Sequence, residues 1–368
     1  MKDLKIIVPE NFTDFGEKVN AHINKLRKTN KNYLVNTELV RFGNGEGKAV
    51  IKETIRDKDL YIMSDVSNYD VSYNFYGRKH YMSPDEHFMD IKRILSAECG
   101  HADKRTVIMP YLYESRQDKK DNRESLDCGF SLSELVNMGA NEIITCDVHN
   151  RGVMNAVHST SFESVYLGDM LLMDLITNEE CVDFDRYICV SPDEGAQGRA
   201  RLFSELLGSE AFGYFYKKRD YTKVVDGKNP IMEHKFLGPS DLSGKYAIIV
   251  DDMIASGGSI LDSALALKKL GVEKIYLVVS FALFTEGADK FNEYYHRGII
   301  DRVYASNVSY VPNEYKYLPW FKSVDCSYKI ANIINELNRG RSVGDLITGS
   351  KTDTAVKIKK LRREYEKK

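Results

Sequence analysis

Short apolar runs alternate with amphipathic helical segments along most of the chain. Between positions 60 and 148 the pattern predicts strands 60–64, 105–111 and 142–148, a helix beginning at Ser83 and a helix over 126–138. Pro84 and Glu86 follow Ser83 as they do in a capping box with proline in the first helical position. Strands that alternate with helices in this way predict parallel sheets covered by helices.

A second series of the same kind follows. It contains predicted strands 187–190, 211–216, 246–250 and 274–283, with helices 196–207 and 259–270. Gly208 and Gly271 stand where a left-handed residue closes each helix. Because 368 residues are many for one core, the two series predict two α/β domains, 1–165 and 166–348.

Three stretches depart from this rhythm. Residues 69–82 are polar and rich in tyrosine, and residues 220–244 form a long polar connection, so both are predicted as loops. The tail 349–368 is basic, and we expect a solvated terminal helix or a frayed end in preference to a partner-binding tail.

Composition excludes several classes of protein. A net charge of -2 argues against a general nucleic-acid binder, which would show a basic excess. The 6 cysteines are scattered without a CxxC pair, as expected of reduced thiols inside a cell. Since no apolar stretch approaches the roughly 20 residues of a membrane-spanning helix, we expect a cytoplasmic protein without membrane or nucleic-acid partners.

The segment from Val250 to Ser259 is the strongest candidate site. Asp251 and Asp252 stand at the carboxyl end of an apolar strand, where open α/β sheets bind ligands. The chain then turns into a helix through Ala255, Ser256, Gly257, Gly258 and Ser259. Adjacent glycines allow close backbone approach, and a helix start favours an anion by about 0.3–1 kcal/mol. These features predict a phosphate site.

The two aspartates cannot serve the same anion, because their charges would repel it. Their carboxylates suit the vicinal hydroxyls of a sugar or a Mg²⁺ ion, so the whole segment describes a site for a phosphorylated ribose. The alternative is that Asp252 is a turn residue and the glycines form only a tight loop. Residues 238–245 do not provide a P-loop, because they contain one residue too many.

Other polar groups also stand at strand ends. His149 and Asp193 could hold Mg²⁺ on a nucleotide, although His149 alone also suits a hydrogen-bonded strand end. Lys217 and Arg219 open the long polar connection, either as a solvated turn or as a lid that brings cations to a phosphoryl group in transfer. Residues 116–118, Arg-Gln-Asp, would bind ATP or form a charged loop.

Seven short motifs follow one another between Arg41 and Leu346. They are Phe42-Gly43-Asn44-Gly45-Glu46, Pro110 to Asp118, Asp147-Val148-His149, Ser191-Pro192-Asp193, Lys217-Lys218-Arg219, Val250 to Ser259, and Arg341 to Leu346. In this order they resemble the motifs of the ribose-phosphate diphosphokinase family, the phosphoribosyl-pyrophosphate (PRPP) synthetases. Each motif is short, but seven in one order are specific.

This resemblance implies two phosphoribosyltransferase-type domains, each a mainly parallel sheet flanked by helices. It implies ATP and ribose 5-phosphate as substrates, with Mg²⁺ as cofactor and a homo-oligomer (dimer or hexamer) as the assembly. In the implied reaction the anomeric hydroxyl of ribose 5-phosphate attacks the β-phosphorus of Mg-ATP, diphosphate moves to C1, and AMP leaves.

The resemblance also assigns roles residue by residue. ATP would be bound by Phe42, Asn44, Glu46, Arg116, Gln117, Asp118 and His149. Ribose phosphate would be bound by Asp251, Asp252, Ala255, Ser256, Gly257, Gly258 and Ser259. The metal would lie at His149 and Asp193, and Lys217 and Arg219 would be catalytic.

Two other functions share parts of this pattern. A phosphoribosyltransferase would have the aspartates and the glycine loop, but it needs one such domain and no adenine motif. A non-catalytic regulatory homologue would bind without turnover, and the retained Lys217 and Arg219 argue against it. Ala255 replaces the usual Asp and Ser256 the usual Thr, and 69–82 looks like an insertion, so the resemblance is to a divergent member.

Overall fold

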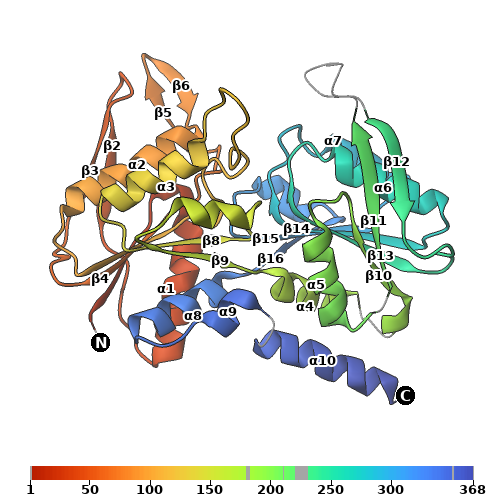
Figure 1. Ribbon diagram of the computed structural model, residues 1–368. Coiled ribbons are helices and arrows are strands. Elements are labelled where there is room, and N and C mark those ends of the chain that lie inside the picture. The colour runs from red at the N-terminus through yellow and green to blue at the C-terminus, as the bar shows by residue number, and fades with distance from the viewer. Residues whose placement is uncertain (1, 180–182, 210, 220–230, 350–351, 368) are drawn as a thin grey trace. The chain divides into compact units, whose positions relative to one another are not determined.

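The computed structural model describes residues 2–179, 183–209, 211–219, 231–349 and 352–367, without the side chains of 218, 219 and 231–233. The chain forms two compact units, shown together in Figure 1 and treated separately below. Unit 1 comprises Met1–Tyr166, Asn307–Tyr310 and Asp325–Thr348. Unit 2 comprises Leu167–Ser306, Val311–Val324 and Gly349–Lys368.

A five-stranded sheet forms the centre of unit 1, in the order β1-β4-β7-β8-β9 with every neighbour parallel. The strands are β1 (Leu4–Ile7), β4 (Asp59–Met63), β7 (Lys104–Ile108), β8 (Glu142–Cys146) and β9 (Ser161–Val165). The helices are η1 (Glu10–Phe12), α1 (Thr13–Arg27), α2 (Pro84–Glu98), α3 (Asp127–Asn137), η2 (Arg151–Ala156), α8 (Ser327–Asn338) and α9 (Gly344–Thr348). Figure 1 shows α2 and α3 on one face of the sheet and α1 and α8 on the other.

Local sequence explains how α2 begins. Ser83 Oγ accepts a hydrogen bond from the Glu86 N–H at 3.3 Å, and Glu86 Oε2 accepts one from the Ser83 N–H at 2.9 Å. The predicted capping box is therefore confirmed. The helix then packs Ile91, Ile94 and Leu95 into the core of unit 1.

Unit 1 also has two hairpins outside the sheet. One joins β2 (Thr37–Arg41) to β3 (Gly47–Ile51), and the other joins β5 (Ser72–Phe75) to β6 (Arg78–Tyr81). The prediction of a loop over 69–82 is wrong, because most of this stretch is the second hairpin. Tyr73 and Phe75 of β5 contact Glu86 of α2 and Gly45 of the β2–β3 turn rather than a sheet core.

Unit 2 is built on a seven-stranded sheet in the order β12-β11-β10-β13-β14-β15-β16, parallel except where β12 meets β11. The strands are β10 (Tyr187–Ser191), β11 (Phe212–Arg219), β12 (Ile231–Leu237), β13 (Tyr246–Ile254), β14 (Lys274–Ala282), β15 (Arg302–Ser306) and β16 (Phe321–Val324). The helices are α4 (Gly168–Asn178), η3 (Phe184–Arg186), α5 (Gln197–Leu207), α6 (Gly258–Lys269), α7 (Asp289–His296), η4 (Asn313–Tyr317) and α10 (Asp353–Glu366). In Figure 1, α6 and α7 cover one face and α4 and α5 the other, as right-handed crossovers require.

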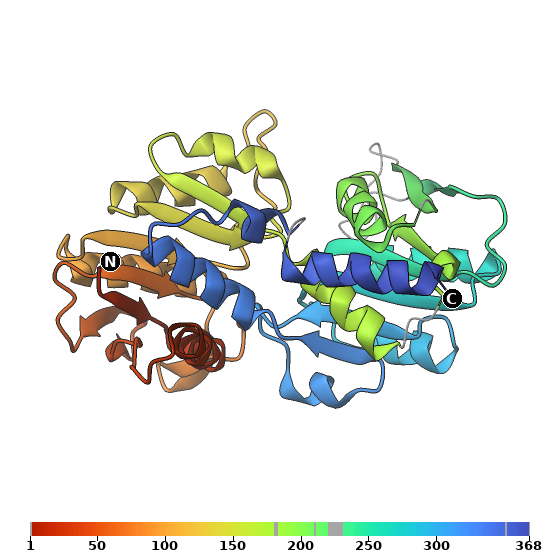
Figure 2. The same ribbon diagram turned by 90° about the horizontal axis from the view of Figure 1, so that it is seen from below.

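Two expectations about unit 2 are corrected. The connection 220–244 is not loop throughout, because β12 pairs antiparallel with β11. The tail is neither frayed nor fully solvated, since α10 buries Ala355 and Ile358 and packs against α4 and α5 (Figure 2).

The segment 325–348 also differs from its predicted place. Sequence position puts it in the C-terminal domain, but α8 packs against α1 in unit 1. Arg27 Nε donates to Asn335 Oδ1 at 2.9 Å, and Asn338 Nδ2 donates to the buried Asp59 Oδ2 at 2.7 Å.

The helices of the described ranges include none with the length and apolar character that a membrane span requires.

Candidate active site

The loop that follows β13 in unit 2 turns directly into α6. Gly257 is the N-cap of this helix and has the left-handed φ of 80°. A Cβ atom on Gly257 would lie 2.5 Å from the Phe291 ring, whereas one on Gly258 would meet only Ser256 Oγ, at 4.0 Å. Because glycine has no side chain with which to cap the helix, the N–H groups of the first turn suit an external anion.

One cation reaches this loop from a neighbouring strand. Lys217 lies on β11, and its Nζ donates a hydrogen bond to Ser259 Oγ in the first turn of α6. The pairing of β11 with β12 continues to Arg219, with a register shift between Lys218 and Arg219. The side chain of Arg219 and all of residues 220–230 lie outside the described part of the chain, so the catalytic role of Arg219 stays a prediction.

The carboxylates lie within β13 rather than after it. The strand runs to Ile254 instead of ending at the predicted Val250, because the pairing with β14 continues. Asp252 is buried, and its Oδ1 accepts the Met253 N–H at 2.8 Å. Asp251 Oδ1 accepts the Asp252 N–H at 2.9 Å. Both side chains therefore stay at the carboxyl end of the sheet, beside the loop.

Asp251 carries the clearest electrostatic signal of the site. Burial, followed by repulsion from Asp252 and Asp193, raises the pKa of Asp251 well above its usual range. Asp193 follows β10, and its Oδ1 accepts the Ala196 N–H at 3.1 Å. Three aspartates from two adjacent strand ends thus concentrate negative charge, which hydroxyl donors of a ligand or a divalent cation would relieve.

Arg199 is a member of this site that the sequence reasoning missed. It lies in the first turn of α5, and its Nη2 is 3.6 Å from Asp252 Oδ2. Its place six residues after Asp193, in a helix that begins at a strand end, was the available signal. Arg199 offsets part of the charge of Asp252.

Replacing Asp251 with asparagine is expected to stabilise the protein at alkaline pH. The folded protein keeps the Asp251 proton to higher pH than the unfolded chain does, so stability is lost as the pH rises from the ordinary aspartate range through the raised pKa. Asparagine avoids this loss. We expect a gain of at least about 1 kcal/mol in the free energy of unfolding near pH 8, since one pKa unit is worth about 1.4 kcal/mol.

Urea titrations of wild-type and Asp251→Asn protein near pH 8 and near pH 3.5 check this. At the lower pH the wild-type side chain is neutral as well, so the gain should vanish. A gain of the same size at both pH values would show that charge is not its source.

The nucleotide candidates lie in unit 1, and two of their segments meet. His149 is exposed just after β8, where Asp147 adopts a left-handed φ of 34°. Asn150 Nδ2 donates a hydrogen bond to Asp118 Oδ2, which joins this strand end to the segment 116–118. Arg116 and Gln117 are exposed beside that contact. The structure therefore groups four of the predicted ATP-binding residues.

The remaining three occupy the turn between β2 and β3. Phe42 is 46% exposed, and its N–H donates to the Glu46 carbonyl at 2.8 Å. Asn44 Nδ2 donates to Glu46 Oε2 at 3.1 Å. We call residues 42–46 the adenine turn, after their predicted role.

The two residues proposed to bind the metal lie in different units. His149 belongs to unit 1 and Asp193 to unit 2. Among the described residues, no cluster of three or more His, Cys, Asp or Glu could hold a metal ion. Mg²⁺ commonly takes one or two carboxylates together with substrate phosphates and water, so the donors fit an ion that arrives with a nucleotide.

The chain is similar to known proteins in both of its units. A family model described as the N-terminal domain of ribose phosphate pyrophosphokinase matches residues 4–139, and one described as the phosphoribosyl synthetase-associated domain matches residues 222–348. Among curated proteins, the ribose-phosphate pyrophosphokinase of Synechococcus elongatus is 28% identical over 280 residues, covering 75% of this chain and 76% of the relative. The ribose-phosphate pyrophosphokinase of Mycoplasmopsis pulmonis is 27% identical over 310 residues, covering 83% of this chain and 86% of the relative.

The solved structures confirm the fold. Phosphoribosylpyrophosphate synthetase from Mycobacterium smegmatis superimposes with a TM-score of 0.75 at 20% identity, over 92% of this chain and all of the other. The expectation of two α/β domains with mainly parallel sheets is therefore confirmed. This chain belongs to the ribose-phosphate pyrophosphokinase family, which is another name for the diphosphokinases that its motifs resemble.

Proposed function

We propose that this chain transfers diphosphate from Mg-ATP to the C1 hydroxyl of ribose 5-phosphate, forming PRPP and AMP for nucleotide biosynthesis. One observation carries the proposal. In unit 2 three features meet at the loop between β13 and α6. They are the start of α6, which has no side-chain cap, the aspartates near the end of β13, and Lys217. Those groups match the phosphate, the ring hydroxyls and the reacting end of a sugar phosphate. The names of the curated relatives favour the same reaction.

In the proposed reaction unit 2 orients the nucleophile. The N–H groups at the start of α6, with Ser256 and Ser259, take the 5-phosphate, while Asp251 and Asp252 accept hydrogen bonds from ring hydroxyls. The C1 oxygen then forms a bond to the β-phosphorus as the bond to the bridging α–β oxygen breaks. AMP leaves with that oxygen, and the C1 hydroxyl gives up its proton to solvent.

Charge neutralisation is the other requirement. Mg²⁺ spreads the charge of the triphosphate when bound, and we assign Asp193 and His149 to its coordination, directly or through water. Lys217 and Arg219 would bring positive charge to the phosphoryl group in transfer, where it counts most in the absence of water. The adenine turn and residues 116–118 would hold the nucleotide.

An assay of AMP release tests the proposal. Purified protein with Mg-ATP and ribose 5-phosphate should release AMP in equal amount to PRPP, and none when ribose 5-phosphate is omitted. Chelation of Mg²⁺ should stop the reaction. Release of ADP instead of AMP would identify an ordinary kinase. The absence of AMP, whether or not inorganic phosphate is added to the assay, would contradict catalysis by this chain.

We also propose that the chain assembles with copies of itself, as a dimer or hexamer, in the cytoplasm. The resemblance of its motifs to the family sets the expectation of the assembly. Light scattering on the eluted protein measures the assembly, and a mass equal to one chain at the concentrations of the assay would contradict it.

A further inference from the structure

The β5–β6 hairpin has an unusual tip. Phe75 pairs with Arg78, so the connecting turn consists of Tyr76 and Gly77 alone. Both have positive φ, 47° and 78°. Such turns favour Asn-Gly, and a tyrosine in the first position is strained. The Tyr76 N–H donates to the Gly43 carbonyl at 2.7 Å, so the strained tip is bonded directly to the adenine turn.

One face of the hairpin is aromatic. Tyr73 and Phe75 alternate along β5, and His80 is the cross-strand partner of Tyr73. Ring centroids are 6.2 Å apart for Tyr73 and Phe75, and 5.4 Å apart for Phe75 and His80. Phe75 faces the adenine turn, since a Cβ on Gly45 would lie 3.0 Å from its ring. Gly45 has a φ of 90° and no side chain, so it leaves room for the Phe75 ring.

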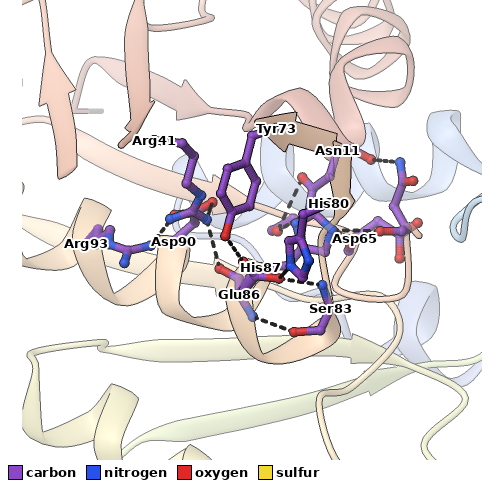
Figure 3. A network of polar contacts seen from close by, with 12 residues as sticks. Asn11, Arg41, Asp65, Tyr73, His80, Ser83, Glu86, His87, Asp90 and Arg93 are labelled. Carbon is purple, nitrogen blue, oxygen red and sulfur yellow. Dashed lines mark hydrogen bonds and ion pairs between the residues drawn. The ribbon is translucent and has the colours of Figure 1, made fainter. Parts of the chain in front are cut away.

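The base of the hairpin is fixed to α2, as Figure 3 shows. Tyr73 Oη donates to Glu86 Oε1 at 2.8 Å, and His80 Nε2 lies 2.9 Å from Glu86 Oε2. Burial alone would raise the pKa of Glu86, but hydrogen bonds from the Ser83 N–H, His80 and Tyr73 outweigh it and lower that pKa. The anchor is thus a charged carboxylate held on three sides.

The strand that leads into the adenine turn is tied to the same network (Figure 3). The Arg41 guanidinium lies 5.8 Å from the centre of the Tyr73 ring, and Arg41 Nη2 is 2.6 Å from Asp90 Oδ2. Arg93 Nη1 binds the other oxygen of Asp90 at 2.9 Å. The turn is therefore held at its first flank by Arg41 and at its middle by the hairpin.

We propose that the β5–β6 hairpin positions the adenine turn for the base of ATP, with Phe75 as the positioning residue. This inference rests on the proposed function, which places the nucleotide at that turn. A turn held in one conformation before binding loses less conformational freedom when the ligand arrives. The hairpin thus sets nucleotide affinity without touching the reacting atoms.

Phe75→Ala tests the proposal. The KM for ATP should rise about fivefold to tenfold, which is the size expected when a few side chains must be ordered by the ligand. The kcat at saturating ATP and the KM for ribose 5-phosphate should stay within about twofold of wild type, because unit 2 is unchanged. Phe75→Tyr keeps the ring and should restore the ATP KM.

Tyr81→Ala is the matched control. Tyr81 is an aromatic residue of the same hairpin, 50% exposed, on the face opposite Phe75. Its loss should leave all kinetic constants near wild type. An unchanged ATP KM in Phe75→Ala would overturn the proposal, and so would a fall in kcat with both KM values raised, which would show a general structural role.

Calorimetric titration with Mg-ATP separates this proposal from the proposed function. If the wild type binds Mg-ATP but releases no AMP, the function fails. Weaker binding by Phe75→Ala, with Tyr81→Ala unaffected, would then still support the hairpin's role. If the wild type does not bind Mg-ATP, both proposals are overturned.

Discussion

Lys217→Met is expected to lower the kcat for PRPP formation by about 10²–10³, the usual cost of removing one group that stabilises transition-state charge. Lys217 is the one catalytic candidate whose side chain is described, and it contacts Ser259 at the start of α6. The KM for ribose 5-phosphate should change little, because the N–H groups of α6 still bind the 5-phosphate. Steady-state measurement of AMP release gives both constants.

Lys235→Met is the matched control for this prediction. Lys235 is exposed on the neighbouring strand β12, where it pairs with Tyr216. Its removal takes away the same charge from the same pair of strands. A large rise in the ribose 5-phosphate KM of Lys217→Met at constant kcat would show that Lys217 only helps to bind the 5-phosphate.

Gly257→Ala is expected to remove ribose 5-phosphate binding and to destabilise unit 2. A non-glycine residue in the left-handed region costs about 1–3 kcal/mol. The new methyl group would also meet the ring of Phe291, which is buried and stacks on Trp320 with ring centroids 5.6 Å apart. We expect a free energy of unfolding lower by at least about 1 kcal/mol and a KM for ribose 5-phosphate at least about tenfold higher.

Gly258→Ala provides the comparison for stability. It lies in the first turn of α6, and a Cβ there meets nothing closer than 4.0 Å. Alanine is also favoured in a helix, so this variant should unfold like the wild type. If Gly257→Ala proved as stable as Gly258→Ala and still bound ribose 5-phosphate, the left-handed N-cap would not be needed for the site.

Local patterns predicted only part of the regular structure of this fold, and they did best around the strand, loop and helix of the candidate site. The apolar run before Asp251, the paired glycines and the amphipathic stretch after them are short-range signals, and strand, loop and helix appear there. The same holds for the capping box at Ser83. Such signals succeed because the backbone within a few residues satisfies its own geometry.

The β5–β6 hairpin and the edge strand β12 were missed for a physical reason. Tyr76-Gly77 lacks the usual Asn-Gly turn signal, and the apolar face of β5 packs on a turn instead of a sheet. Likewise β12 has a partner on one side only, β11, and carries polar residues that resemble a loop. In each case the partner that stabilises the strand is specified by tertiary structure.

In the candidate site, too, local sequence indicated some residues while other contacts depend on tertiary structure. Chemistry and chain order indicated the aspartates, the glycine loop and the basic strand end. The contact of Arg199 with Asp252 depends on how α5 packs beside β13, and the link from Asn150 to Asp118 depends on two loops meeting. Neither pair is close in sequence, so no local pattern could reveal it.

The crossing of α8 into unit 1 has a consequence for synthesis on the ribosome. Asp59 and Arg27 receive their partners Asn338 and Asn335 only after unit 2 up to Val324 has been synthesised. We therefore expect the face of α1 to stay uncovered until α8 has been synthesised. A fragment ending at residue 166 would lack that cover, so we expect it to fold less stably than unit 1 does in the full chain.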